Sequence, residues 1–309
     1  LMAPVAFAGP TKVKVAFATW VGYGPLYIAK DKGFFDQYGL DVELMIIDDE
    51  SQYAAAMASG SIDALGNVLD REVIHYAKGT PEVVLFAMDE SSGGDGIIAT
   101  ADVKSLADLK GKNIGLDKSS TSYFFFLTAI EKAGLSEAAV TIHEMGASDA
   151  GAAFVAGKLD AAVSWEPWLS KASDREGGHV LVSSKDLPRT IVDVFVMRRD
   201  FADKHPEAAV GMTKAWLDAV AWYQANADEG NAIMAKHLGE KPEDIADMAS
   251  GVTFFGREGN QAFFDRTTDS NIYDVAARAG KFWKSKGILK KDLDVDGLIS
   301  DQCIQAATR

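Results

Sequence analysis

The regular alternation of strand-like and helix-like segments through the first two thirds of the chain constrains its fold most. Short apolar runs are each followed by a segment with helical features, such as Pro25 in a first helical turn or Gly60 after a last one. Strands are expected over 13–18, 42–47, 62–66, 83–88, 97–99, 113–116, 140–144, 161–165 and 192–197. Strands that alternate with helices predict an α/β fold, with parallel sheets covered by helices on both faces.

Two features of the pattern indicate two similarly wound units. The segments 60–64 and 157–161 both run from a helix end through a glycine, an apolar residue and Asp-Ala into an expected buried strand. After residue 197 the pattern becomes helical, with helices expected over 206–225, 232–237, 242–250 and 273–286. A lobe formed from both ends of the chain, with a second lobe inserted, would account for this order.

Length, charge and cysteine content exclude several classes of protein. A chain of 309 residues exceeds the usual size of one domain, which favours two domains over the alternative of one large α/β unit. The net charge of −14 repels nucleic acid, which we therefore exclude as a partner. Cys303 is the only cysteine, so an intramolecular disulfide and a multi-cysteine metal site are both excluded.

The first residues predict export from the cytoplasm. An apolar run ends in Ala6-Phe7-Ala8, which is the small-x-small pattern that precedes a signal-peptidase cleavage site. Residues 1–8 are therefore interpreted as the remnant of a signal peptide, with a mature protein that starts near Gly9 and is secreted to the periplasm or another extracytoplasmic space. A frayed hydrophobic N-terminus is the alternative. No later run reaches the roughly 18 to 20 apolar residues of a membrane span.

Four stretches of the chain carry a resemblance to a known family. They are GPLYIAKDKGFF at 24–35, SLADLKGKNIG at 105–115, GKLDAAVSWEPW at 157–168 and VDVFVMRRDF at 192–201. In their order and spacing they resemble type II periplasmic binding proteins of the taurine, alkanesulfonate and nitrate group, which also includes binders of thiamine precursors. The resemblance extends from residue 13 to about residue 225.

The resemblance implies a two-lobed type II periplasmic binding protein fold, each lobe a mainly parallel sheet flanked by helices. The first lobe would comprise 9–97 and 194–309 and the second 98–193, joined by crossover strands at 97–99 and 192–194. A small-molecule ligand would lie between the lobes, which would close around it by a hinge motion. The implied partner is the permease of an ABC importer, and we expect a monomer without cofactor or bound metal.

Residues that follow strands are the best candidates for the ligand site, because ligands of open α/β sheets bind at the carboxyl ends of the strands. The candidates that follow strands are Thr19, Trp20, Tyr23, Asn67, Asp70, Asp89, Ser91, Asp95, Ser120, Thr121, Ser122, Trp165, Glu166 and Trp168. Asp193, inside the crossover strand, is a further candidate. Each type has a structural alternative. The hydroxyls at 120–122 either bind an anion at a helix N-terminus or only cap the helix, the aromatic residues either form cleft walls or belong to the core, and the acidic residues are otherwise solvated.

Asp193 decides the class of ligand that we expect. It lies inside an apolar strand, and it matches the strand aspartate that holds the ligand amine in the taurine-binding branch of the family. An acidic, aromatic cleft suits a cation, and no arginine occurs among the candidate residues. We therefore expect an amine-bearing zwitterion or cation, either a taurine-like aminosulfonate or a guanidinium or amine compound. An alkanesulfonate, nitrate or a pyrimidine-type solute is the alternative.

The sequence favours a solute-binding protein over an enzyme or the sensor lobe of a signalling protein. The chain has no phosphate-binding loop, no nucleophile elbow and no His-Glu-x-x-His zinc motif. Its histidines show no ligand spacing, and they are His75, His143, His179, His205 and His237. Pyrimidine-synthesis enzymes of this fold rely on a cysteine-rich stretch that this chain lacks. A sensor lobe would normally accompany a membrane anchor or a DNA-binding domain.

Overall fold

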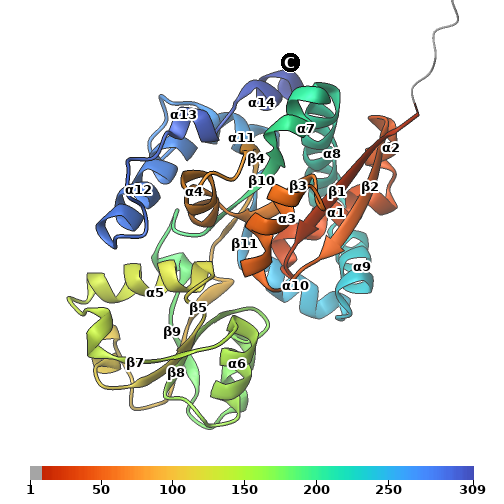
Figure 1. The fold of residues 1–309 in the computed structure, drawn as a ribbon. Coiled ribbons are helices and arrows are strands. Elements are labelled where there is room, and N and C mark those ends of the chain that lie inside the picture. Colours follow the sequence, from red (N-terminus) through yellow and green to blue (C-terminus); the bar gives the residue numbers. More distant parts are fainter. Residues whose placement is uncertain (1–8) are drawn as a thin grey trace, which may run out of the picture.

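The computed structural model describes residues 9–309, which form two lobes that are each built on one β-sheet (Figure 1). The predicted signal-peptide remnant, residues 1–8, lies outside the described residues. Among the helices of the described part, none is both long and apolar enough to cross a membrane.

The first lobe contains a six-stranded sheet in the order β11-β4-β10-β3-β1-β2. Its strands are β1 (Thr11–Phe17), β2 (Leu40–Ile46), β3 (Ala64–Val68), β4 (Glu82–Ser91), β10 (Val192–Arg198) and β11 (Val252–Phe254). Strand β1 pairs in parallel with β2 and β3, whereas β10 runs antiparallel between β3 and β4.

The second lobe contains a five-stranded sheet in the order β7-β6-β8-β5-β9. Its strands are β5 (Asp95–Ala99), β6 (Asn113–Leu116), β7 (Thr141–Glu144), β8 (Ala161–Trp165) and β9 (His179–Ser183). The side chains alternate as expected for a sheet covered on both faces. Ile97 and Val163 belong to the core cluster that includes residues of helix α5 (Thr121–Lys132), and Ile98 and Ala162 to the one that includes residues of α6 (Ala147–Val155).

The two sheets are mixed rather than mainly parallel, which corrects one detail of the expected fold. The predicted parallel pairing is present in β2-β1-β3 and β7-β6-β8. The strands next to the connections between lobes, β5 and β10, are antiparallel to their neighbours because the chain reverses as it leaves one sheet for the other. The connections themselves are 92–94 and 184–191, so the predicted boundaries at 97/98 and 193/194 fall inside strands β5 and β10.

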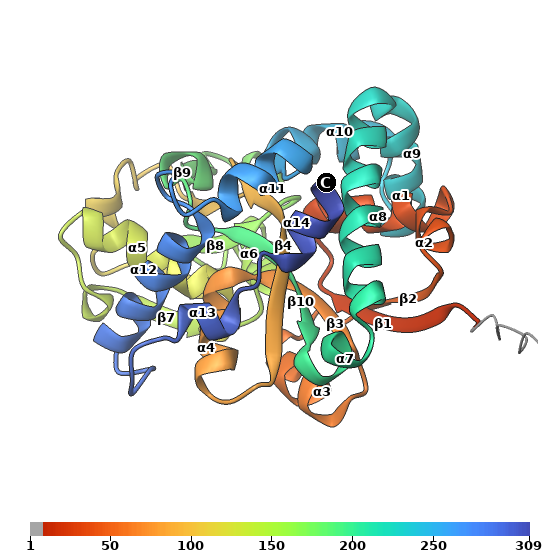
Figure 2. The ribbon, with the colours of Figure 1, turned by 90° about the horizontal axis from the view of Figure 1, so that it is seen from above.

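Helices cover the sheet of the first lobe, and those after β10 form the helical C-terminal part of the chain. They are α1 (Gly24–Asp31), α2 (Phe34–Gln37), α3 (Tyr53–Ser59), α4 (Leu69–Ala77), α7 (Arg199–Lys204), α8 (Pro206–Ala225), α9 (Ala227–Leu238), α10 (Pro242–Ser250), α11 (Arg257–Phe264), α12 (Ile272–Ser285), α13 (Val295–Leu298) and α14 (Gln302–Thr308). Short 3-10 turns are η1 (Val21–Tyr23), η2 (Glu50–Gln52), η3 (Leu106–Leu109), η4 (Glu137–Ala139), η5 (Ser170–Asp174) and η6 (Ser184–Asp186). Figure 2 shows α8 and α9 on the side of the molecule away from α5 and β7.

Aromatic packing fixes the central strands of the first sheet. The rings of Phe86 on β4 and Phe195 on β10 stack at 4.8 Å, and Trp216 of α8 lies 5.9 Å from Phe86. All three side chains are buried. Burial of large aromatic side chains is a main source of stability in a core. This cluster therefore holds β4 and β10 in the register that places their acidic residues side by side.

Candidate functional site

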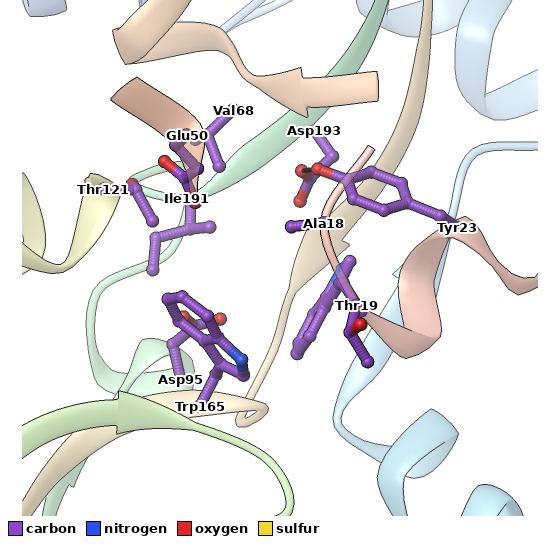
Figure 3. A pocket seen from close by; sticks show the side chains of 11 residues that line it. Ala18, Thr19, Tyr23, Glu50, Val68, Asp95, Thr121, Trp165, Ile191 and Asp193 are labelled. Atoms are coloured by element: carbon purple, nitrogen blue, oxygen red, sulfur yellow. Dashed lines mark hydrogen bonds between the residues drawn. The ribbon is translucent and has the colours of Figure 1, made fainter. Parts of the chain in front are cut away.

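A pocket lies between the two lobes, where the carboxyl ends of strands from both sheets meet (Figure 3). The first sheet and the loops beside it contribute Ala18, Thr19, Trp20, Tyr23, Glu50, Val68, Ile191 and Asp193. The second lobe contributes Asp95, Thr121 and Trp165. A ligand in this pocket would therefore contact both lobes.

Two aspartates face each other across neighbouring strands at the first-lobe side of the pocket. Asp193 on β10 is the ladder partner of Asp89 on β4, and both side chains are buried. The hydroxyl of Tyr23 donates a hydrogen bond to Asp193 Oδ1, and Trp20 Nε1 donates to Asp89 Oδ1 at 3.1 Å. The second carboxylate oxygen of Asp89 is buried without a hydrogen-bond partner. Opposed like charges destabilise a sheet, so this pair requires a proton or a cation.

The electrostatics of the pair agree with that requirement. Burial, with the charge of Asp89, raises the pKa of Asp193 well above its ordinary value. Burial raises the pKa of Asp89 to about 7, although the hydrogen bond from Trp20 acts in the opposite direction. Near neutral pH the pair therefore holds protons that exposed aspartates would have lost.

Asp95 and Trp165 present a carboxylate and an indole from the second lobe. They are cross-strand partners on β5 and β8, and Figure 3 shows their side chains together at the pocket. Asp95 is buried, and its backbone N–H donates to Ser91 Oγ at 3.1 Å. Burial raises the pKa of Asp95 to about 7, and the charge of Glu166 acts in the same direction.

Glu50 is a pocket carboxylate that the sequence analysis missed. It opens η2, shortly after β2, and one of its carboxylate oxygens is buried without a hydrogen-bond partner. Burial raises the pKa of Glu50 to about 8, although the charge of Arg71 opposes the shift. The sequence could have indicated Glu50, because the acidic run 48–50 directly follows the predicted strand 42–47. Ligands of open α/β sheets bind at the carboxyl ends of strands, so residues in that position are candidates.

The start of helix α5 meets an acid rather than an open space for an anion. Ser120 is the N-cap, and its hydroxyl accepts a hydrogen bond from the N–H of Ser122 at 3.3 Å. Thr121 Oγ1 donates to Asp70 Oδ1 of helix α4 at 3.0 Å, which links the two lobes. A carboxylate next to a helix N-terminus is favourable, and Asp70 thus occupies the position that suits a sulfonate or nitrate.

The structure brings only part of the predicted site to the pocket. The predicted residues in its lining are Trp20, Tyr23, Asp95, Thr121, Trp165 and Asp193. Those outside the lining are Asn67, Asp70, Asp89, Ser91, Ser120, Ser122, Glu166 and Trp168. Thr19, which follows the first predicted strand, is also in the lining. Lining residues that the prediction did not include are Ala18, Glu50, Val68 and Ile191.

Several of the residues outside the lining have other contacts. Trp168 lies so close to Gly151 of α6 that a Cβ there would come within 2.4 Å of its ring. Glu166 accepts a hydrogen bond from the N–H of Ser170 at 3.0 Å. Ser91 pairs with Ser184 at 2.7 Å between their hydroxyl oxygens. Glu166 and Trp168 follow β8 as predicted, whereas Ser91 is the last residue of β4. The direction of each side chain depends on neighbours that are distant in sequence.

The pocket is acidic and aromatic. Within the described residues, its lining includes three carboxylates and two indoles but no lysine, arginine or histidine. When they are ionised these carboxylates only accept hydrogen bonds, so the deprotonated pocket offers acceptors and negative charge.

Comparison with known proteins assigns the family. A model described as the NMT1-like family matches residues 7–239. The chain belongs to the NMT1-like family. A relative of this NMT1-like chain is the taurine-binding periplasmic protein of Escherichia coli, which is 26% identical over 302 residues that cover 93% of this chain and 92% of the relative.

Solved structures share the fold of the NMT1-like chain. The periplasmic aliphatic sulphonate binding protein of Escherichia coli superposes with a TM-score of 0.77 and 20% identity, covering 93% of this chain and 97% of that protein. The periplasmic nitrate-binding protein of Synechocystis PCC 6803 superposes with a TM-score of 0.76 and 20% identity, covering 96% and 88%. The predicted two-lobed fold is thus confirmed. These relatives are periplasmic binding proteins and not enzymes, as the sequence analysis predicted for this chain.

Proposed function

We propose that this NMT1-like protein is the periplasmic solute-binding component of an ABC importer and that its ligand is a small organic cation with a guanidinium or amine group. The observation that carries the choice of ligand is the set of pocket carboxylates, Glu50, Asp95 and Asp193, with no basic side chain among the described lining residues. The proposal also implies a permease as protein partner and a protein that acts as a monomer.

Charge balance is the first argument for a cation. Burying carboxylates without a partner costs several kcal/mol each, and proteins avoid it by protonation or by pairing with a cation. Asp95 belongs to the second lobe and Asp193 to the first. A cation between them would gain its full interaction only when the lobes are closed. It would therefore favour closure, as the importer's binding component requires.

The number of acceptors and the aromatic walls favour a guanidinium group over a primary ammonium. An ammonium donates three hydrogen bonds from one point, whereas a guanidinium is a flat fork of N–H groups that pairs with carboxylates and stacks on aromatic faces. The pocket offers both kinds of contact, since carboxylates approach from the two lobes and Trp20 and Trp165 both line it.

A taurine-like aminosulfonate is the second candidate, favoured by the 26% identity to a taurine-binding protein over most of both chains. Its amine would suit Asp193. Its sulfonate would find only uncharged donors, such as the hydroxyl of Thr19 and the indole N–H of Trp165, because the hydroxyl of Thr121 already donates to Asp70. A simple alkanesulfonate, nitrate or a neutral pyrimidine would leave the carboxylates unpaired.

A ligand screen by thermal shift on refolded, ligand-stripped protein tests the proposal. Guanidinium, methylguanidine and small amines are compared with taurine, alkanesulfonates, nitrate and pyrimidines at equal ionic strength. Ligand at 100 times its Kd should stabilise the protein by about 2.7 kcal/mol, which is a visible rise in Tm. We expect the guanidinium compounds to give the largest shifts. Shifts confined to anions would refute the cation site.

Replacement of Trp165 by leucine tests the aromatic wall. We expect affinity for a guanidinium ligand to fall about 5- to 30-fold, because a cation over an indole face gains roughly 1 to 2 kcal/mol when desolvated. Trp222→Leu is the matched control, since this tryptophan of α8 lies under Lys32, at 4.3 Å, and is outside the pocket lining. Isothermal titration measures both variants, and equal losses in the two would remove Trp165 from the site.

A further inference from the structure

A second group of buried acidic side chains lies in the first lobe, outside the solute pocket. Helix α4 carries Glu72 and, one turn later, His75, and strand β4 opens with Glu82. The turn between them contains Gly79 in the left-handed region at φ 102°, which returns the chain so that Glu82 comes beside the helix. One ligand atom from each of the three residues lies within 4.8 Å of the other two.

The carboxylates of this group are fully buried and short of partners. Glu72 and Glu82 are both 0% exposed, and neither side-chain oxygen of Glu82 has a hydrogen-bond partner. Glu72 Oε2 also has no partner, while Glu72 Oε1 accepts from Asn67 Nδ2 at 2.5 Å and lies 3.1 Å from His75 Nδ1. Three buried carboxylate oxygens of the group thus have no hydrogen-bond donor among the described residues.

Arg199 is close enough for its charge to act on Glu82, but it forms no ion pair with the group. Arg199 directs its guanidinium to main-chain oxygens, donating to the carbonyl of Glu82 at 3.0 Å and to that of Gly297. No ion pair joins Arg199 to either glutamate in the described part of the chain. Two buried carboxylates side by side then need a shared proton or a bound cation.

The mixture of donors discriminates between cations. Calcium and magnesium prefer sites made of oxygen atoms, with six or more ligands. Two carboxylates and an imidazole are a ligand set of Zn²⁺ and other first-row divalent metals, which take three protein ligands when a further position holds water. The amide of Asn67 supports Glu72 from behind, as outer groups commonly do at metal sites.

We propose that Glu72, His75 and Glu82 form a binding site for a divalent first-row transition metal ion of the Zn²⁺ type. The ion would tie helix α4 to the start of strand β4. It would be structural, because the group lies outside the lining of the solute pocket.

Zinc titration of the full chain tests the site. Protein dialysed against EDTA is titrated with ZnCl₂ by calorimetry, and bound zinc is counted by mass spectrometry after equilibrium dialysis. We expect about one zinc per chain and a rise in Tm with zinc. Glu82→Gln and His75→Gln should each weaken zinc binding by more than the roughly 10- to 100-fold that loss of an outer-shell partner costs.

A matched control uses a histidine–glutamate pair on the surface. Glu207→Gln changes the acid that lies 3.6 Å from His205 Nδ1, and zinc affinity should stay within twofold of the wild type. Circular dichroism verifies that each variant is folded, and His75→Gln keeps both carboxylates if Glu82→Gln proves unstable. Equal zinc affinity in wild type and both variants overturns the proposal. So does absence of zinc binding together with a more stable Glu82→Gln variant, which would identify a shared proton.

Discussion

Replacing Asp193 with asparagine is expected to weaken binding of a guanidinium ligand by roughly 2 to 4 kcal/mol, or about 30- to 700-fold. The variant keeps the shape of the side chain and the oxygen that accepts from Tyr23, but it removes the negative charge that lines the pocket. The ligand would then lose a buried, charge-assisted hydrogen bond. Isothermal titration at pH 8, where the carboxylate contributes most, measures the change.

The same variant should not destabilise the ligand-free protein at pH 8. Asp193 and Asp89 are opposed on neighbouring strands, and an amide in place of one carboxylate relieves their repulsion. Loss of affinity with equal or greater stability therefore separates a role in binding from a defect in folding. Chemical denaturation provides the stability, and a variant that is both unstable and weak in binding would not support the proposal.

Asp218→Asn is the matched control for that experiment. Like Asp193, Asp218 accepts a hydrogen bond from a tyrosine, here Tyr38 at 2.5 Å, but it lies on α8 and outside the pocket lining. Its replacement should leave ligand affinity within twofold of the wild type. If Asp193→Asn binds as tightly as this control does, Asp193 is not a ligand residue.

Affinity for a cation should rise steeply as the pH increases from 5 to 8. Burial raises the pKa of Asp95 and of Asp89 to about 7 and that of Glu50 to about 8, so these groups are largely protonated at pH 5. A cation binds the ionised forms, and its binding must then release protons. Each proton released gives about a tenfold gain in affinity per pH unit.

The stability of the ligand-free protein should change in the opposite direction. A carboxyl group whose pKa is raised by folding holds its proton in the folded chain at pH values where the unfolded chain has lost it. The unfolded state then binds fewer protons, so the free energy of unfolding falls as the pH rises from about 4 to about 8. For a single shift of the size of that of Asp95, from 3.8 to about 7, the loss is on the order of 4 kcal/mol.

Denaturation at pH 5, 6, 7 and 8 measures this loss, and calorimetry in buffers of different ionisation enthalpy counts the protons released on binding. The negative charge of Glu166 adds to the rise in the pKa of Asp95, whereas the positive charge of Arg71 opposes the rise in the pKa of Glu50. Affinity that falls with rising pH would instead indicate an anionic ligand.

Local sequence patterns predicted most of the fold. Period-two and period-3.6 patterns depend on neighbours within a few residues, so strands such as β6 and β8 and the long helix α8 were placed close to their observed bounds. Two of the elements that were missed carry such signals. Helix α4 has Leu69, Val73 and Ala77 at intervals of four residues, and β9 contains the apolar run Val180-Leu181-Val182. Strand β11 spans only three residues, and its edge position follows from pairing with β4.

The site was predictable only as far as the carboxyl-end rule applies. That rule placed Trp20, Asp95 and Trp165 at the pocket, whereas Asp193 was selected as an acid inside an apolar strand. The acidic and aromatic character of all four was visible in the chain. The rule could not predict that Ile191 lines the pocket, because Ile191 precedes a strand. Nor could it predict that the side chain of Trp168 lies outside the lining. Both depend on how the two lobes pack.

By itself the sequence determined the alternation of strands and helices, the acidic character of the cleft and the presence of Asp193 in an apolar strand. Only the tertiary structure decided that Asp193 lies opposite Asp89, and that Glu82 returns to the face of helix α4. The physical reason is that periodicity and turn chemistry act over a few residues, whereas the pairing of strands and the direction of buried side chains are set by packing between segments far apart in the chain.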